Sequence, residues 1–474
     1  MKTSYTDTGY LVYKSVLSKE FTTKIKKDLT VTPETGFDTH VFQDESFKVY
    51  RESVLKFRIP RYYGIKHFGY PQTIKLSQAK SVDIPFRGKL KKETKQDEAT
   101  DAILKAMTDD EKIGGGGILS LPPGYGKTTC ALYIVSKMKV KTLIVVHKEF
   151  LMNQWIERIE QFLPNAKIGI LRQDRVEVED KDIVVCMLHS VSMKEYPKGT
   201  YDDFGLTVID EVHHICSKVF SKALYKFNTK YKLGLSATPE RKDGLSKVLE
   251  WFIGPVLYGI ERKNQTGVTV EVKRFKHDRF KEELPMNRMG KLNSPELINI
   301  LVSIKERNDL ILDTVEELYE KKRNIMILTD RRDHCFFLEK EINERYGENT
   351  AGLYIGGMKP DALKESEEKQ IIIATYSLAH EGLDIPKLDS LILASPKSDV
   401  VQACGRIMRE TKGKLHEPYI VDIVDAVGPM MAQHSKRKQF YKKSGFQFHG
   451  KVKEIELAEE TPSQELSGYA FIDD

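Results

Sequence analysis

Residues 114–130, GGGGILSLPPGYGKTTC, decide the fold of this chain. The apolar run at 118–121 predicts a buried strand. The Pro-Pro-Gly-Tyr-Gly stretch predicts a turn, and Lys127 opens a segment of good helix formers. A strand, a glycine turn and a helix in this order form a cradle in which amides and the helix N-terminus face a phosphate. Lys127 adds a positive charge, and the Thr128 hydroxyl is a ligand for Mg²⁺.

The cradle departs from the strict pattern at one place. The GxxxxGK[ST] pattern requires Gly where this chain has Leu121, although the shorter GxGKT form is intact. The short form can be a turn by accident, so the rest of the chain must support it. The residues that we assign to nucleotide binding here are contiguous: Leu121, Pro122, Pro123, Gly124, Tyr125, Gly126, Lys127, Thr128 and Thr129.

Bulk composition indicates a soluble, intracellular protein. A length of 474 residues predicts two to four domains, 40% hydrophobic residues suffice for their cores, and the net charge of +6 is mild. Five cysteines, an odd number without a CxxC pair, indicate reduced core thiols rather than zinc or disulfides. We expect no membrane span, because no apolar run is long enough, and no signal peptide at the N-terminus.

Strands and helices alternate after the cradle. The apolar runs at 142–146, 183–186, 206–209 and 233–235 predict parallel strands of a doubly wound α/β domain. Ligands of such sheets bind at the carboxyl ends of the strands, where DEVH (210–213) and SATP (236–239) lie.

A second series of alternating elements follows and has no cradle of its own. We expect helices at 300–319 and 335–342, and strands at 324–329, 371–375 and 391–394. The charged stretch 254–294 predicts a connector with a β segment at 268–272. The two halves therefore resemble one fold used twice, with the chemistry shared between them.

Three further segments are strongly charged. The window Phe47–Lys95 holds thirteen Lys or Arg, three acids and eight aromatic residues, which suits phosphates and bases. Our candidates there for nucleic-acid contact are Arg58, Arg61 and Lys66. Two alternatives are a small β-rich domain with an ordinary aromatic core, and a protein-docking domain. Residues 436–453 are basic again, and 454–474 form an acidic tail.

Hydrolysis of a phosphoanhydride needs a metal, a positioned water and positive charge on the phosphoryl group. Asp210 ends an apolar strand and can hold Mg²⁺ opposite Thr128, while Glu211 can orient and deprotonate water. The helical spacing of Gln402, Arg406 and Arg409 places all three on one face, as an arginine finger from the second domain requires. The context also makes Gln96 a candidate for the adenine edge.

Taken together, LPPGYGKT, DEVH, SATP, ATYSLAHEGLDIP and QACGRIMR resemble the helicase motifs of superfamily 2 over about residues 90–425. GLSATPERKDG and EGLDIP are most similar to XPB-like DNA helicases, and within these to the transcription helicases of large cytoplasmic DNA viruses, including the poxvirus transcript-release type. His147 stands where that family often has Pro.

The resemblance implies a role for each matching residue. Lys127 and Thr128 would take phosphate and Mg²⁺, and Asp210 and Glu211 would take metal and water. Residues that would couple hydrolysis to movement are His213, Ser236, Ala237 and Thr238. Thr375 would touch the nucleic-acid backbone. Those that would line the nucleotide cleft or sense the γ-phosphate are Gly382, Asp384, Gln402, Arg406 and Arg409.

We therefore predict an α/β chain with two RecA-like doubly wound parallel-sheet domains in tandem and a small basic N-terminal domain. The predicted boundaries are 1–90, 91–258 for the first helicase domain, 259–298 for the connector, 299–453 for the second helicase domain, and 454–474 for the tail. The predicted function is an ATP- and Mg²⁺-dependent DNA helicase or translocase in viral transcription or repair.

Two alternatives stay open. One is an ATP-dependent RNA helicase, and the other is a non-catalytic nucleic-acid-binding transcription factor with an inactive ATP site. The expected partners are DNA, RNA as the alternative, and RNA polymerase or other transcription proteins. A viral protein of this kind would lie in the virion and in the cytoplasm of the infected cell.

Overall fold

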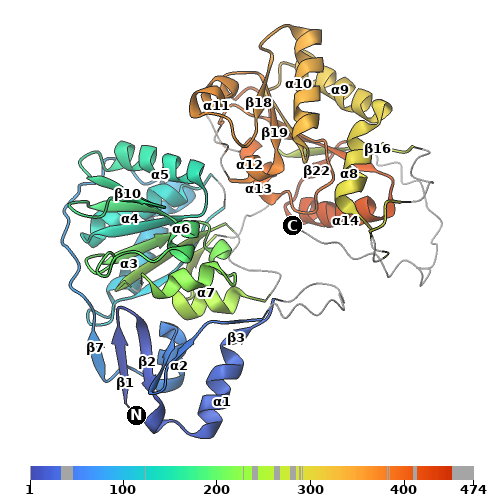
Figure 1. The fold of residues 1–474 in the computed structure, drawn as a ribbon. Coiled ribbons are helices and arrows are strands. Elements are labelled where there is room, and N and C mark those ends of the chain that lie inside the picture. Colours follow the sequence, from blue (N-terminus) through green and yellow to red (C-terminus); the bar gives the residue numbers. More distant parts are fainter. Residues whose placement is uncertain are drawn as a thin grey trace. The chain divides into compact units, whose positions relative to one another are not determined.

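A computed structural model describes residues 2–33, 46–122, 124–227, 229–237, 244–260, 267–277, 284–287, 290, 292–381, 383, 385–408 and 414–450. The chain divides into two compact units, Met1–Glu261 and Arg262–Asp474, and each is described by itself (Figure 1).

The first unit begins with a five-stranded sheet of order β5-β6-β2-β1-β7, mainly antiparallel. Two helices and a small β3–β4 pair accompany this sheet. The elements are β1 (Thr3–Thr6), β2 (Gly9–Tyr13), the 3₁₀ helix Lys14–Val16, α1 (Lys19–Asp28), β3 (Thr30–Val31), β4 (Phe47–Lys48), β5 (Arg51–Glu52), β6 (Lys56–Ile59), α2 (Arg61–Phe68) and β7 (Thr73–Lys75).

An eight-stranded sheet of order β11-β10-β12-β9-β13-β14-β8-β15 forms the rest of the first unit. Its strand pairs are parallel except β10–β11. The strands are β8 (Gly116–Ser120), β9 (Thr142–Val146), β10 (Ile168–Arg172), β11 (Arg175–Val176), β12 (Ile183–Met187), β13 (Leu206–Ile209), β14 (Tyr231–Ser236) and β15 (Val256–Gly259). The four strands predicted after the cradle are therefore confirmed.

Helices of this unit cover the sheet (Figure 1). They are α3 (Gln96–Thr108), α4 (Lys127–Met138), α5 (Glu149–Phe162), α6 (Leu188–Met193) and α7 (Ser246–Phe252), with 3₁₀ segments at Lys92–Thr94, Val212–Ile215 and Phe220–Tyr225. Successive residues of β9 enter different hydrophobic clusters, Leu143 in one and Ile144 in the other. Side chains alternate across a strand, so both faces of the sheet are buried, as a doubly wound sheet requires.

The described residues of 1–90 share their hydrophobic core with the eight-stranded sheet. Tyr5 and Phe57 of the small sheet belong to the same buried cluster as Ile118 of β8. The Tyr62 hydroxyl also donates a hydrogen bond to the Gly116 carbonyl, 3.0 Å away. The predicted N-terminal domain is thus packed onto the sheet that carries the phosphate cradle.

The second unit contains a seven-stranded sheet of order β18-β19-β17-β20-β21-β16-β22, in which every described strand pair is parallel. Its strands are β16 (Thr269–Phe275), β17 (Ile325–Thr329), β18 (Ala351–Tyr354), β19 (Ile371–Thr375), β20 (Ser390–Leu393), β21 (Tyr419–Asp425) and β22 (Gln447–Phe448). Its helices are α8 (Ser294–Ser303), α9 (Lys305–Glu320), α10 (Arg332–Tyr346), α11 (Pro360–Glu367), α12 (Tyr376–Glu381), α13 (Val401–Ile407) and α14 (Gly428–Lys443). The two large sheets, parallel except for the pair β10–β11, confirm the predicted α/β class with tandem RecA-like domains.

Two predictions for the second unit need correction. The β segment expected at 268–272 is confirmed as β16, but β16 lies inside the sheet between β21 and β22, so the stretch 259–298 is not only a connector. Three of the seven residues of β16 are charged, so its sequence lacks a long apolar run. Its partner β22 is short and forms only two residue pairs with it. The helix expected at 300–319 is two helices, since Ile304 is extended (φ −76°, ψ 117°).

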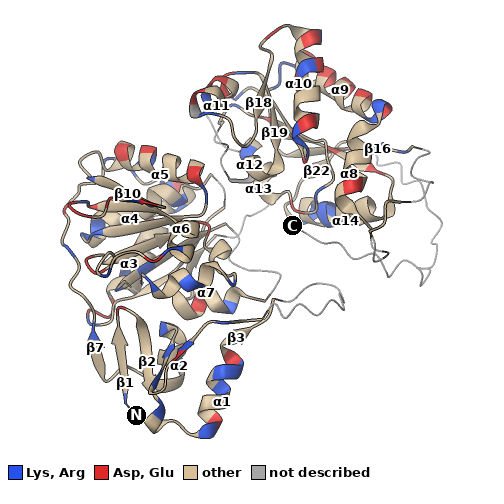
Figure 2. Ribbon diagram, viewed as in Figure 1, with Lys and Arg blue, Asp and Glu red and all other residues tan. Residues whose placement is uncertain are grey.

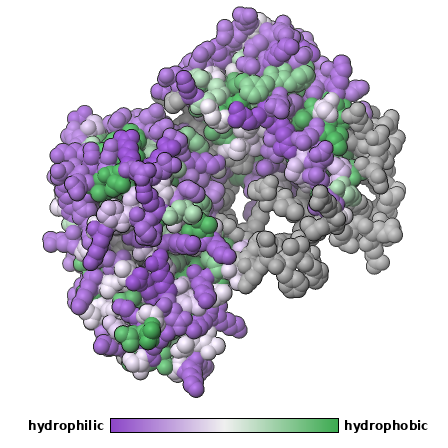
Figure 3. Space-filling view, viewed as in Figure 1, coloured by the Kyte–Doolittle hydropathy of each residue, from purple (hydrophilic) through white to green (hydrophobic). Residues whose placement is uncertain are grey.

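All five cysteines are buried and none forms a disulfide, as the composition predicted. Among the described residues, no helix is both long enough and apolar enough to cross a membrane. The visible surface is mostly hydrophilic, with hydrophobic areas in small patches (Figure 3).

Candidate active site

The phosphate cradle lies between β8 and α4. Gly124 (φ 84°) and Gly126 (φ 82°) are in the left-handed region, which favours glycine. A Cβ atom on Gly126 would lie 2.4 Å from Gln96 Nε2, so this position has no room for a side chain. No side chain caps the N-terminus of α4, and its first turn has no acid. The first amides of this helix are therefore suited to hold an anion.

Gln96 holds the cradle rather than pointing away from it. Its side chain is buried, its Nε2 donates to the Tyr125 carbonyl at 2.9 Å, and its Oε1 accepts from the Lys91 amide at 2.9 Å. This role in fixing the turn was not predicted. Contact of Gln96 with adenine stays a prediction.

Leu121 is a core residue of the first unit. It is 0% exposed and shares a hydrophobic cluster with Cys130 of α4. The departure from the strict glycine pattern therefore adds to the core beneath the cradle. Thr128 and Thr129 lie half-buried in the first turn of α4, whereas Pro123 is outside the described residues.

The acidic pair lies directly after β13, as the sequence predicted. Asp210 Oδ2 accepts a hydrogen bond from the Trp155 indole at 2.8 Å, and Asp210 Oδ1 accepts the Glu211 amide at 3.0 Å. Glu211 has a left-handed backbone (φ 43°, ψ 58°), which is uncommon for a residue other than glycine. Both oxygens of Asp210 are thus fixed by neighbouring groups.

Lys127 connects the cradle to this pair. Its Nζ lies 3.0 Å from Glu211 Oε1, and the two side chains are only 14% and 17% exposed. Because β14 lies between β8 and β13, the ion pair spans the carboxyl end of β14. The sequence placed these residues at strand ends but did not predict that they pair.

Electrostatics separate the two carboxyl groups. Burial, and then the charge of Glu211, raise the pKa of Asp210. Burial also acts to raise the pKa of Glu211, but the Lys127 ammonium and His213 outweigh it, so that this pKa is lowered. Glu211 is therefore the more readily ionised acid, while a nearby cation would stabilise the ionised form of Asp210.

The donor set fits Mg²⁺. A hard divalent cation prefers carboxylate and hydroxyl oxygens, and Asp210 and Thr128 offer them at the carboxyl edge of the sheet. Glu211 Oε2 is buried and accepts no hydrogen bond within the described part of the chain. A buried oxygen of this kind is suited to a water held near the metal.

A row of imidazole rings continues from the acidic pair. His213 Nδ1 lies 3.5 Å from Glu211 Oε2 and 3.3 Å from Ser236 Oγ at the end of β14. The ring centroid of His214 lies 4.3 Å from that of His213 and 4.0 Å from that of His147, which follows β9. The predicted coupling residues His213 and Ser236 are thus in contact, Ala237 follows them, and Thr238 is outside the described residues.

The second unit supplies the other predicted residues. Thr375 ends β19 and is 8% exposed, with its hydroxyl 3.4 Å from Ser377 Oγ. Gln402 and Arg406 lie on α13, and Arg406 Nε donates to the Ala379 carbonyl of α12 at 3.1 Å. Three predicted residues lie outside the described residues: Gly382, Asp384 and Arg409.

Arg61 was wrongly predicted to contact nucleic acid. It is 2% exposed, and its guanidinium donates to the carbonyls of Lys230 (3.0 Å), Ile113 (2.8 Å) and Gly114. It therefore fastens α2 to the segments that precede β8 and β14. Sequence alone did not separate this arginine from surface arginines, because its neighbours are also basic.

Arg58 and Lys66 remain accessible. Lys66 is exposed on α2, and Arg58 on β6 is partly exposed directly opposite Arg51 of β5. Four of the eight aromatic residues of the window instead belong to the buried core, with Phe57 0% and Tyr63 2% exposed. Apart from Arg61, the cations of this window are thus partly or fully exposed, whereas half of its rings are buried.

Comparison with known proteins gives the family. Residues 89–241 match the family model described as "Type III restriction enzyme, res subunit". A protein of Acanthamoeba polyphaga mimivirus, named "Putative ATP-dependent RNA helicase", is 36% identical over 93% of this chain and 85% of its own length. The chain is a superfamily 2 helicase of the kind found in large DNA viruses.

Other viral relatives of this helicase are more distant. An African swine fever virus protein (strain Badajoz 1971 Vero-adapted) named "Putative ATP-dependent RNA helicase" is 25% identical over 74% of this chain and 72% of its own length. A protein of Invertebrate iridescent virus 6 named "Putative helicase" is 29% identical over 69% of this chain and 76% of its own length. The helicase thus resembles these proteins well beyond the nucleotide-binding segment.

Proposed function

We propose that this helicase is an ATP hydrolase that moves along DNA, in viral transcription or repair. The observation that carries the proposal is the constellation of Lys127, Asp210 and Glu211 beside an uncapped helix N-terminus. These groups meet the needs of phosphoanhydride hydrolysis, which are a positive charge, a metal ligand and a base.

In the proposed mechanism, the amides at the start of α4 and Lys127 hold the β- and γ-phosphates of ATP. A phosphate there would compete with Glu211 for Lys127, which would leave Glu211 to orient and deprotonate the attacking water. Asp210, held by Trp155, and Thr128 would hold Mg²⁺. When bound, this ion would stabilise the negative charge that develops on the phosphate oxygens. His213, between Glu211 and Ser236, would transmit the state of the site to the end of β14.

Arg406 and Arg409 of the second unit are proposed to stabilise the transition state as arginine fingers. The hydrogen bond from Arg406 to α12 supports an ordered position for one of them. Thr375 is proposed to contact the nucleic-acid backbone at the end of β19. In the first unit, Arg51 and Arg58 lie opposite each other on a β-hairpin, and like charges in that arrangement favour an anion between them.

RNA is the second candidate substrate, because the mimivirus and African swine fever virus relatives are named as RNA helicases. The ATPase rate of the full chain should be measured with duplex DNA, single-stranded DNA, RNA and no polymer. We expect the largest stimulation with DNA. Stimulation by RNA alone would favour the second candidate, and hydrolysis that no polymer changes would refute a motor on nucleic acid.

A further inference from the structure

Helix α14 has an exposed face that is basic and free of acids. Its sixteen residues contain no Asp or Glu. At roughly 100° per residue, the exposed residues of the helix after its first turn fall within about a third of the helical circumference. They are Ala432, Ser435, Lys436, Gln439, Lys442 and Lys443. We call this set the α14 basic face; Figure 2 shows lysines and arginines along the helix.

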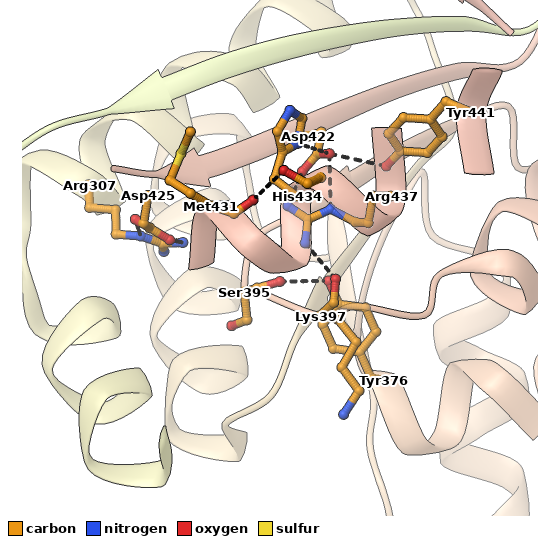
Figure 4. Close-up of polar contacts among 11 residues, drawn as sticks. Arg307, Tyr376, Ser395, Lys397, Asp422, Asp425, Met431, His434, Arg437 and Tyr441 are labelled. Carbon is orange, nitrogen blue, oxygen red and sulfur yellow. Dashed lines mark hydrogen bonds and ion pairs between the residues drawn. The ribbon is translucent and has the colours of Figure 1, made fainter. Parts of the chain in front are cut away.

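The opposite face of α14 is fixed to the sheet by a buried polar cluster (Figure 4). Asp422 of β21 accepts hydrogen bonds from Arg437 Nε (3.0 Å) and Nη2 (2.8 Å) and from the Tyr441 hydroxyl (3.2 Å), and it lies 3.2 Å from His434 Nδ1. Burial acts to raise the pKa of Asp422, but Arg437 and His434 outweigh it and lower this pKa. We call this cluster of Asp422, His434, Arg437 and Tyr441 the α14 clamp. It fixes the rotation of α14 about its axis, so the α14 basic face has a fixed orientation relative to the sheet.

Ion pairing distinguishes the lysines of this face from other exposed lysines of the second unit. Within the described residues, Lys436, Lys442 and Lys443 make no ion pair, whereas Lys305 pairs with Asp309 on α9 and Lys340 with Glu344 on α10. Cations gathered on one face repel one another unless an anion lies beside them. The concentration of positive charge therefore indicates an anionic partner.

The composition of the face indicates which anionic partner it fits. Protein interfaces depend on large apolar or aromatic anchors, and membrane-surface helices insert such residues into lipid. The α14 basic face has neither, since its only apolar residue is Ala432. Small and polar side chains between lysines instead permit close approach of a sugar-phosphate backbone.

We propose that the α14 basic face binds the phosphate backbone of nucleic acid, an inference that rests on the proposed function. The helix follows the carboxyl end of β21 and precedes β22, which runs parallel to β16. It thus leads from the carboxyl edge of the sheet toward the amino edge, over about 24 Å. Lys442 and Lys443 therefore extend the contact away from Thr375 at the carboxyl end of β19.

The test compares the full-length triple variant Lys436→Gln, Lys442→Gln, Lys443→Gln with a control that carries Lys305→Gln, Lys321→Gln and Lys340→Gln. Both lose three exposed lysines of the second unit. Binding of labelled duplex DNA and single-stranded DNA is measured between about 50 and 200 mM salt, where each phosphate contact adds about 0.9 (duplex) or 0.7 (single strand) to the slope of log affinity against log salt. Lysines near a helix C-terminus also stabilise the helix, so the melting temperature is measured too.

On duplex DNA, we expect the plot of log affinity against log salt to be less steep for the α14 variant, by about 2 in slope. Its affinity for DNA should be at least tenfold weaker than that of the wild type, and its basal ATPase rate should equal that of the control. Equal slopes for the two variants, with normal binding by the wild type, would overturn the α14 proposal alone. Wild-type protein that binds no nucleic acid would overturn the proposed function itself. Loss of binding to phosphatidylserine vesicles with an unchanged DNA slope would also overturn the proposal, in favour of a membrane surface.

Discussion

Replacement of Trp155 by Phe should raise the Mg²⁺ concentration that the ATPase needs for half-maximal activity. The indole N–H donates to Asp210 Oδ2 at 2.8 Å, and Trp155 is 2% exposed, so water does not readily replace this bond. A hydrogen bond to a charged group contributes about 1.5–3 kcal/mol. Without it, the pKa of Asp210, already raised by burial and Glu211, should rise further. Less of the metal-binding carboxylate would then be available at neutral pH.

Loss of a group that orients a metal ligand typically lowers metal affinity by about 10–100-fold. We therefore expect the Mg²⁺ concentration for half-maximal ATPase activity to rise about tenfold in Trp155→Phe, while the rate at saturating Mg²⁺ falls less. The assay is steady-state ATP hydrolysis, with nucleic acid present, over a range of Mg²⁺ concentrations.

Ile159→Val is the matched control for packing. Ile159 lies one turn further along α5, is 0% exposed and belongs to the same hydrophobic cluster as Trp155. Its shortening should cost about 0.5–1.5 kcal/mol of stability without touching Asp210. If Trp155→Phe and Ile159→Val show the same Mg²⁺ dependence, the indole does not position Asp210 and the reasoning is refuted.

Three further predictions concern stability and the second unit. Burial and Arg61 lower the pKa of Lys232 from 10.5 to about 7 in the folded chain. Between these pH values Lys232 is protonated in the unfolded chain but mostly neutral in the folded chain. The free energy of unfolding should therefore rise as the pH rises from about 7 to 10.5. Lys232→Met should remove this dependence and raise the melting temperature at pH 7, and a variant that keeps the wild-type pH profile would contradict the assignment. Arg61→Met should destabilise the first unit by about 3 kcal/mol, since three carbonyls lose a buried cation; Lys66→Met on the exposed side of α2 is the control, and equal urea midpoints would show that Arg61 is not a clamp. Arg406→Ala combined with Arg409→Ala should slow ATP turnover at least a hundredfold while ATP affinity, measured with a fluorescent analogue, changes little; an unchanged turnover would exclude the fingers.

The sequence predicted the sheets because their strands are continuous apolar runs. The run at 142–146 is completely buried and forms β9 with the predicted bounds. Motifs at strand ends were also placed correctly, since parallel strands bring their carboxyl ends to one edge. The β segment at 268–272 was predicted, but as part of a connector rather than of the sheet, because a charged strand with a two-residue partner carries little apolar signal.

Tertiary contacts explain what the sequence could not predict. Charge composition treated Arg61 and Lys66 as equivalent, although one is buried against backbone carbonyls and the other is exposed. The hydrogen bond from the Trp155 N–H to Asp210 was not predicted either, because it joins α5 to the end of β13, 55 residues further along the chain. The contact between Asp422 and Arg437 that holds α14 could not be predicted from the sequence either. Asp422 lies in a strand, and Arg437 lies between lysines that are exposed or partly exposed.

Glu211 is proposed to be the base for ATP hydrolysis. Glu211→Gln keeps the size of the side chain and leaves Asp210 and Lys127 in place. In a single turnover with DNA, we expect the variant to bind ATP and Mg²⁺ like the wild type but to hydrolyse ATP about 10²–10⁴-fold more slowly. Hydrolysis at a rate near that of the wild type would contradict the account.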